Sequence, residues 1–164
     1  MKNEIVYPAF FETENDLEKW LNQNIIEYQS CYVFEKGNWK YKDMKGFEHL
    51  YVNGIELTKG IKAINTYSFR NGDWSYKDTD GFWHLFRNGV ELTKGVKAKR
   101  VYSLENGDWY YKDQQNFWHL YRNGKELTAG VRAIDIYSFG NGDWGYTDEQ
   151  GNWHYFDKNN NPIN

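Results

Sequence analysis

Short runs of alternating apolar and polar residues, separated by glycine-containing turns, follow one another through most of the chain. Residues 65–77, with the sequence NTYSFRNGDWSYK, are one example. Runs of this length and alternation are typical of half-buried β-strands, and Asn-Gly between two such runs is typical of a tight hairpin. The pattern therefore predicts an all-β fold built from short antiparallel strands.

The same pattern returns with a period of 35 residues, which indicates a tandem repeat. Tryptophan, tyrosine, aspartate and histidine keep this spacing, and all four histidines of the chain fall in one column. The tryptophan column consists of Trp39, Trp74, Trp109 and Trp144, and the histidine column consists of His49, His84, His119 and His154. We place the four copies at residues 25–59, 60–94, 95–129 and 130–164. They form one predicted β-repeat domain, 25–164, behind an N-terminal segment, 1–24.

Each copy carries turn signals for a meander of four strands. In the second copy, a two-residue turn is expected at Asn71-Gly72 and a three-residue turn at Thr79–Gly81. The pairs that these turns predict are Phe69 with Trp74, Tyr67 with Tyr76, Tyr76 with His84 and Trp74 with Phe86. Trp83 and Leu85 then lie on the opposite face. Because both faces are apolar, each sheet must be covered on both sides.

Two architectures satisfy this requirement. One is an open, β-solenoid-like stack of four-stranded antiparallel sheets, and the other is a small four-bladed propeller. A period of 35 residues is short for a propeller blade, and the first and last copies are degenerate, as in capped stacks, so we favour the open stack. Residues 16–28 carry a helical apolar stripe that includes Leu17, Leu21 and Ile25, preceded by the cap candidates Thr13 and Asn15. We expect one N-terminal α-helix that caps the first repeat.

Composition and charge narrow the function. Aromatic residues make up 20% of the chain, the net charge is −3 and the sequence pI is about 5.8, so we expect neither nucleic acid nor a membrane as partner. A single cysteine, Cys31, and the lack of an apolar leader favour the cytoplasm, although they do not exclude secretion.

The histidine column offers the most conspicuous chemistry. Its members are 35 residues apart, so a metal site would require convergence around an axis, and we expect no metal and no cofactor. We expect each histidine to bond the aspartate of its own hairpin instead, as His84 with Asp78. Identical groups repeated four times differ from the single asymmetric site of an enzyme, so we predict a non-catalytic protein.

Two resemblances to known repeats point the same way. Residues 141–153, NGDWGYTDEQGNW, resemble the WG-type repeat family, although its glycine is present only as Gly145. Residues 82–98, FWHLFRNGVELTKGVKA, resemble more weakly the aromatic hairpins of choline- and glucan-binding cell-wall repeats. Both resemblances imply a non-enzymatic binding or interaction array.

The candidate ligand-binding residues are tryptophans and arginines of the third strands: Trp83, Trp118, Trp153, Arg87 and Arg122. Exposed indole rings beside polar groups suit carbohydrate recognition, and tryptophan and arginine also anchor protein interfaces. We therefore expect a multivalent carbohydrate- or cell-wall-binding module, with an intracellular protein-protein interaction scaffold that sequesters a partner as the alternative. A third interpretation is that these tryptophans only fill the space between copies.

Overall fold

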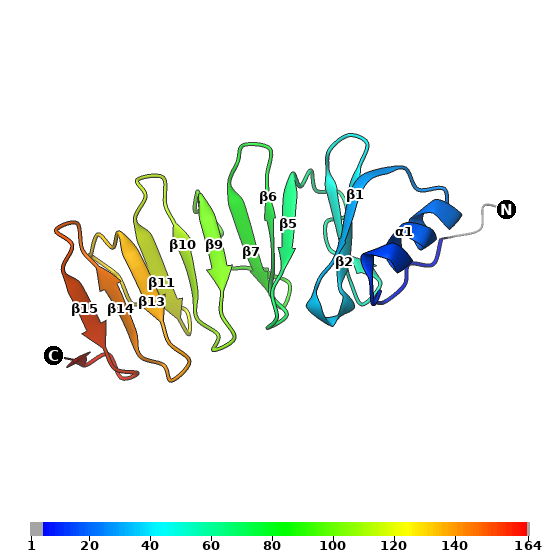
Figure 1. The fold of residues 1–164 in the computed structure, drawn as a ribbon. Coiled ribbons are helices and arrows are strands. Elements are labelled where there is room, and N and C mark those ends of the chain that lie inside the picture. The colour runs from blue at the N-terminus through cyan, green and yellow to red at the C-terminus, as the bar shows by residue number, and fades with distance from the viewer. Residues whose placement is uncertain (1–4, 164) are drawn as a thin grey trace. The chain divides into compact units, whose positions relative to one another are not determined.

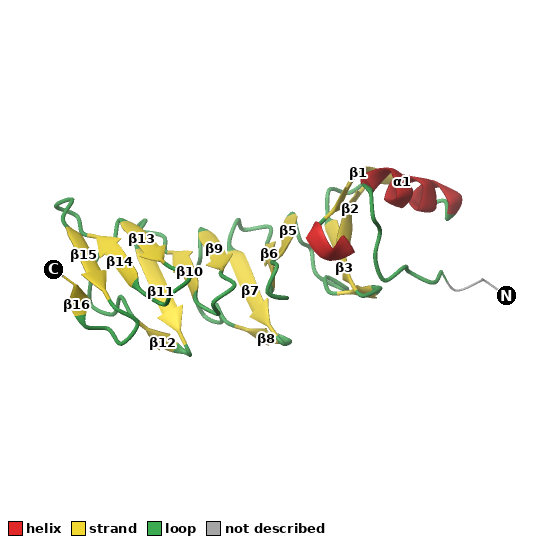
Figure 2. Cartoon of the chain, turned by 60° about the horizontal axis from the view of Figure 1, so that its bottom comes forward, coloured by secondary structure: helices red, strands yellow, loops and turns green. Residues whose placement is uncertain are grey.

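The computed structural model describes residues 5–163 and confirms the all-β prediction (Figures 1 and 2). Each copy forms one antiparallel sheet whose four strands are in chain order, β1-β2-β3-β4, β5-β6-β7-β8, β9-β10-β11-β12 and β13-β14-β15-β16. One α-helix, α1 (Glu14–Gln23), precedes the first sheet, and a short 3-10 turn, η1 (Glu35–Gly37), follows β1. The strands are β1 (Tyr28–Val33), β2 (Trp39–Asp43), β3 (Glu48–Val52), β4 (Ile55–Glu56), β5 (Asn65–Ser68), β6 (Trp74–Lys77), β7 (Trp83–Arg87), β8 (Val90–Glu91), β9 (Arg100–Ser103), β10 (Trp109–Lys112), β11 (Trp118–Arg122), β12 (Lys125–Glu126), β13 (Asp135–Ser138), β14 (Trp144–Thr147), β15 (Trp153–Phe156) and β16 (Pro162–Ile163).

The chain divides into two compact units, Met1–Gly81 and Phe82–Asn164. The predicted single domain over 25–164, like the choice between open stack and propeller, stays a prediction. Each sheet has two faces, which we name by the tryptophans. The rear face carries the first residue of the second strand, as Trp39 does in the first sheet, and the forward face carries the first residue of the third strand, as Trp118 does in the third sheet.

The predicted register of the second hairpin is right and that of the first is wrong. Trp109 pairs with Tyr121 and Tyr111 with His119, which is the register expected around the three-residue turn. In the first hairpin of the second copy, however, Tyr67 pairs with Ser75, and Ser68 pairs with Trp74. A one-residue slip moves a side chain to the other face of a sheet. Tyr67 therefore lies on the forward face, away from Trp74.

The slip has a visible cause in the turn. The Phe69 N–H donates to the Asp73 carbonyl at 2.8 Å, and the Gly72 N–H donates to the Phe69 carbonyl at 3.1 Å. The loop therefore holds three residues, 70–72, in place of the expected two. Asn71 supports this longer loop, because its side-chain oxygen accepts the Asp73 N–H at 3.0 Å.

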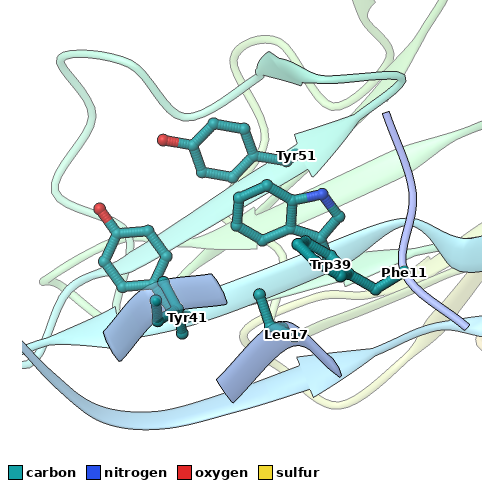
Figure 3. Packing of buried hydrophobic residues seen from close by; sticks show 6 residues of the cluster. Phe11, Leu17, Trp39, Tyr41 and Tyr51 are labelled. Atoms are coloured by element: carbon teal, nitrogen blue, oxygen red, sulfur yellow. The ribbon is translucent and has the colours of Figure 1, made fainter. Parts of the chain in front are cut away.

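The helix α1 covers the rear face of the first sheet, as expected. Thr13 is its N-cap and accepts the Asp16 N–H, while Leu17 and Leu21 are fully buried. Figure 3 shows Leu17 and Phe11 beside the rings of Trp39, Tyr41 and Tyr51. The indole of Trp39 is stacked on Tyr51 at 4.1 Å between ring centroids. The rear face of the first sheet is thus sealed by the N-terminal segment.

The helix ends earlier than the apolar stripe indicates. Asn24 is the C-cap, and the side-chain amide of this residue donates to the Trp20 carbonyl at 2.9 Å. Ile25 has φ of +56° and is exposed, so it does not extend the stripe. The Ile26 N–H turns back to the Leu21 carbonyl at 3.0 Å and closes the last turn.

The forward face of the first sheet packs against the second copy within the first unit. Glu48, which stands where the other copies have tryptophan, is buried there. Its carboxylate accepts the Thr66 N–H at 2.6 Å and the Thr66 hydroxyl at 2.8 Å, and it pairs with the Lys40 ammonium at 2.7 Å. Glu48 therefore joins two copies through hydrogen bonds instead of a ring.

We expect Leu17→Ala to lower the free energy of unfolding by about 2–5 kcal/mol, because it opens a cavity between α1 and the aromatic rings of the first sheet. Urea denaturation followed by far-UV circular dichroism measures the change. Lys19→Ala, on the exposed side of the same helix, is the control and should shift the value by less than about 0.5 kcal/mol. Equal losses of unfolding free energy in both variants would contradict the packing of α1 against the first sheet.

Candidate functional site

Consecutive sheets within a unit pack forward face on rear face. In the second unit, Trp118 and Leu120 on the forward face of the third sheet form one buried cluster with Ile136, Trp144 and Tyr146 of the fourth. The backbone N–H of Trp118 also donates to the backbone carbonyl of Ala133 at 2.8 Å, and Ala133 lies in the segment that leads into the fourth copy. The covering copy thus supplies both apolar contact and a hydrogen-bond acceptor.

The three candidate tryptophans occupy different environments. Trp118 is only 8% exposed, and the ammonium of Lys112 lies 5.1 Å from its ring centroid. Trp83 is half-buried, and its backbone N–H donates to the backbone carbonyl of Ala98 at 2.8 Å. Trp153 is 49% exposed. The expectation of exposed rings is therefore correct for Trp153 and wrong for Trp118, because the fourth sheet covers Trp118. A binding role for this column stays a prediction.

The forward face of the fourth sheet is the open counterpart of these covered faces. We call it the end face and define it by Tyr137, Trp153, Tyr155 and Ile163, which the strand register places on one side. Trp153 lies 4.9 Å from Tyr137 and 5.9 Å from Tyr155 between ring centroids, and the rings of Trp153 and Tyr155 are nearly parallel, at 9°. Tyr155 is 43% exposed, whereas its counterpart in the third copy, Leu120, is fully buried.

Gly145 allows Tyr155 to lie against the sheet. A Cβ atom at this position would come within 3.1 Å of the Tyr155 ring and 2.7 Å of the His154 carbonyl oxygen. The glycine that carries the WG resemblance is therefore needed for close packing on the end face. Sequence reasoning did not single out Tyr137 or Tyr155, although the replacement of a leucine by Tyr155 in the last copy was a signal for them.

A hollow of about 370 Å³ adjoins the end face. Its lining includes Phe139, Asp143, Tyr155 and Ile163. Asp143 accepts hydrogen bonds from the Asn141 amide at 2.7 Å and the Lys158 N–H at 3.1 Å. The hollow is thus mainly apolar with one carboxylate in its wall.

The equivalent carboxylate of the third copy is fully enclosed. The Asp108 carboxylate accepts hydrogen bonds from Nε and Nη2 of Arg122, at 2.9 and 2.6 Å, and from the Ser138 hydroxyl at 2.7 Å. Asp108 belongs to the third copy and Ser138 to β13 of the fourth, so this cluster joins the two copies. The chain places Asp157 where the third copy has Arg122, and Asp143 therefore lacks this clamp.

Arg87 makes the corresponding connection between the second and third copies. Its guanidinium donates to the Gly107 carbonyl at 3.0 Å and to the Ser103 hydroxyl at 3.4 Å. Arg87 thus contacts the next copy directly, whereas Arg122 bonds Asp108 of its own copy, and Asp108 in turn accepts the Ser138 hydroxyl of the next copy. Their proposed ligand-binding role stays a prediction, and the contacts shown are structural.

The histidine column forms bonds inside each copy. In the first copy, His49 lies between two carboxylates, with Nδ1 2.7 Å from Glu56 and Nε2 3.2 Å from Asp43. His119 repeats the arrangement with Glu126 at 2.7 Å and Asp113 at 3.0 Å. His154 contacts Asp148 at 2.9 Å. The expected histidine–aspartate bond is therefore present in these three copies. Asparagine stands in the fourth copy where the others have the glutamate.

A histidine that bonds two carboxylates must donate from both ring nitrogens, which favours the imidazolium form. The hydrogen bond to Glu56 is the main reason why the pKa of His49 is raised, and the bond to Asp43 adds to it. For Asp43, burial opposes ionisation, but the Phe47 N–H and His49 outweigh burial and lower the pKa of that carboxyl. The ring of His49 also stacks on Tyr41 at 4.7 Å. These bonds stabilise the hairpins.

Among residues 5–163, no group of three or more His, Cys, Asp or Glu side chains is arranged to hold a metal ion. No helix in the described part of the chain is long and apolar enough to cross a membrane. Burial is the main reason why the pKa of the half-buried Cys31 thiol is raised to about 11, so this thiol is largely protonated near pH 7.

We expect Glu56→Gln to lower the pKa of His49, because the amide attracts the imidazolium less than the carboxylate does. A raised pKa in the folded state means that the charged ring stabilises the fold fully below pH 6.5, the ordinary value, and loses this effect as the pH rises through the raised value. An NMR titration of the imidazole protons measures both pKa values. Glu126→Gln, at the equivalent place beside His119, is the control and should leave the titration of His49 unchanged. If Glu56→Gln leaves the titration midpoint of His49 unchanged, the hydrogen bond to Glu56 is not the main cause of the raised pKa.

Comparison with known proteins shows no matching family model and no match among curated proteins. Several solved structures are similar in fold. A structure described as YCF48 bound to D1 peptide matches with 10% identity, over 84% of this chain and 52% of that chain, at a TM-score of 0.45. The WD40 β-propeller domain of Doa1 matches with 16% identity, over 78% and 50%, at 0.40. BBS1N in complex with ARL6DN matches with 6% identity, over 82% and 50%, at 0.39. The chain thus spans about half the length of each of these proteins.

Proposed function

We propose that the chain is a non-catalytic β-repeat module that binds a protein partner through its end face. The observation that carries this proposal is the contrast between equivalent residues. Trp118 is 8% exposed beneath the fourth sheet, whereas Trp153 is 49% exposed. Large exposed rings gathered on one sheet face are the usual mark of an interaction surface.

The covered faces indicate what kind of molecule fits the open one. In the third copy, the forward face receives apolar side chains from the fourth sheet and a backbone carbonyl, that of Ala133, from the segment that leads into that sheet. The end face has Trp153 at the position of Trp118, with Tyr155 in place of Leu120 and Asp157 in place of Arg122. A protein with an exposed β-sheet or extended segment can supply both kinds of contact. This supports the protein-binding alternative over the carbohydrate interpretation.

The rim of the end face suits a protein interface as well. Tyr137 donates its hydroxyl to the exposed carboxylate of Asp135 at 2.7 Å. The apolar centre formed by Trp153 and Tyr155 is thus bordered by a polar group. An apolar centre with a polar rim is the usual anatomy of a protein interface.

Glycan binding is the second candidate, and one observation favours it. The rings of Trp153 and Tyr155 are parallel within 9° and form a flat apolar surface, which matches the C–H face of a sugar ring. If the chain binds a glycan, as its resemblance to cell-wall repeats suggests, the sugar would bind at Trp153 on the end face, because Trp118 is buried.

A photo-crosslinker distinguishes the two candidates. We expect the full chain with Tyr155→p-benzoylphenylalanine, irradiated in a lysate of its native host, to form covalent adducts with protein. Trp153→Ala in the same chain should reduce the adduct yield at least tenfold, because it removes the largest ring of the surface. Phe10→p-benzoylphenylalanine, at an exposed aromatic position of the first unit, is the control for non-specific capture.

Glycan arrays and a titration of tryptophan fluorescence with soluble glycans form the second arm. The proposal expects no saturable change in fluorescence and adducts only at position 155. A saturable glycan response that Trp153→Ala abolishes, together with equal protein adducts at positions 10 and 155, would overturn it in favour of glycan binding.

A further inference from the structure

We propose that the partner protein presents a lysine side chain to the end face and that the ammonium group of this lysine binds on the ring of Trp153. This inference rests on the proposed function, because it names the chemistry that the partner brings to the same surface. Two observations lead to it. The third copy places a lysine of its own on the equivalent ring, and the fourth copy lacks that lysine and has a carboxylate nearby instead.

The third copy shows how the chain uses the ring at this position. Lys112 and Trp118 stand opposite each other on β10 and β11, and the Lys112 ammonium lies 5.1 Å from the centroid of the indole ring. At such a distance the negative face of an aromatic ring attracts a cation, and tryptophan does so most strongly. The rings of Tyr102 and Tyr110 lie beside Trp118, at 5.9 and 5.5 Å between centroids. The third copy thus supplies a cation to a group of three rings.

The first copy makes the same contact across its strands with a different acceptor. Lys42 stands opposite Glu48, and the two side chains form an ion pair at 3.8 Å. In both copies, the fourth residue of the second strand is therefore a lysine that contacts the first residue of the third strand. Three of the four copies have lysine at this position, as Lys42, Lys77 and Lys112.

The fourth copy keeps the tryptophan and lacks the lysine. Thr147 stands opposite Trp153, and this short, uncharged side chain supplies no ammonium group. The indole ring still belongs to an aromatic group, with Tyr137 at 4.9 Å and Tyr155 at 5.9 Å between centroids. Trp153 is 49% exposed, so a cation from another molecule can reach it. The group that fits is the one that the third copy uses, the ammonium of a lysine.

The charge beside the ring also changes between the two copies. The forward face of the third sheet carries Arg100 opposite Lys112, whereas the fourth sheet carries Asp135 opposite Thr147. Asp135 is exposed and accepts a hydrogen bond from the hydroxyl of Tyr137, a member of the aromatic group. An ammonium bound on the ring therefore has a carboxylate nearby, which attracts it further.

The rest of the fourth copy is acidic as well. Residues 95–129 include six basic and four acidic residues, whereas residues 130–164 include two basic and five acidic ones. Asp157 takes the position of Arg122, and the side-chain amide of Asn161 is the main reason why the pKa of this carboxyl is lowered. Charge complementarity therefore favours a basic partner, and a lysine over an uncharged apolar side chain as the group that binds the ring.

Two peptides that differ in one ammonium group test the proposal on the purified full chain. One is a tripeptide with lysine between two leucines, blocked at both ends, and the other has norleucine, which keeps the four-carbon chain, in place of lysine. We expect the lysine peptide to shift the backbone amide resonance of Gly145 in a saturable NMR titration and to bind about fivefold more tightly than the norleucine peptide. Trp153→Ala should abolish this difference. Equal affinities, or no saturable shift with either peptide, would overturn the proposal.

Thr147→Lys gives the fourth copy the lysine of the other three. Its ammonium should take the ring, so we expect the lysine peptide to bind about tenfold more weakly. Gln150→Lys, which adds the same charge in the exposed turn between β14 and β15, is the control and should change the affinity by less than about twofold.

Asp135→Asn, at an exposed position, serves as a second variant because Thr147 is buried and its replacement can disturb folding. It should weaken binding of the lysine peptide about threefold and leave the norleucine peptide unaffected. Unchanged affinity for the lysine peptide in Asp135→Asn and in folded Thr147→Lys contradicts the proposal.

Modified lysates separate this inference from the proposed function. Acetylation removes the charge of lysine side chains, whereas reductive methylation keeps it. We expect Tyr155→p-benzoylphenylalanine to capture protein from untreated and methylated lysates of the native host, and about tenfold less from an acetylated lysate. Equal adduct yields from the acetylated and methylated lysates would overturn the lysine contact and leave the proposed function standing. Both fail if the untreated lysate gives no adduct.

Discussion

The structure depends on one kind of contact, in which the rear face of each sheet covers the aromatic and aliphatic side chains on the forward face of the sheet before it. A single four-stranded sheet of about 35 residues exposes apolar residues on both sides and could not bury them alone. In the second unit, the cluster of Trp118, Leu120, Ile136 and Trp144 shows how two sheets solve this together. In the first unit, Glu48 and Thr66 make the corresponding connection through hydrogen bonds.

This dependence explains why the ends of the array differ from its middle. The first sheet has no preceding copy, and α1 with Phe11 takes the place of one. The fourth sheet has no following copy in this sequence, and its rings are exposed where their counterparts are buried. The same residue column is thus buried by packing in the third copy and exposed in the fourth. The difference in exposure at this column follows from whether a sheet covers the ring, while Tyr155 and Asp157 are changes in residue type that accompany it.

Much of the fold could be predicted from the sequence, because it is specified locally. The 35-residue period, the glycine turns and the N-cap at Thr13 are visible in the chain itself. The register of the first hairpin was missed because Asn71-Gly72 suits a two-residue turn, whereas Asn71 and Asp73 hold a longer loop. The exposure of the tryptophan column depends on which sheet lies above each ring. The sequence of one copy does not contain that information, and so Trp118 was expected to be exposed although Ala133 and Ile136 cover it.

The central claim is that neighbouring sheets shield each other's rings, and a pair of matched substitutions tests it most directly. Urea denaturation of Trp118→Ala and Trp153→Ala, at equivalent positions of consecutive copies, compares a covered ring with an open one. The account predicts that Trp118→Ala lowers the free energy of unfolding by about 3–5 kcal/mol and Trp153→Ala by less than about 1 kcal/mol when the chain is monomeric. Equal losses at the two positions, or a larger loss at Trp153, would contradict it.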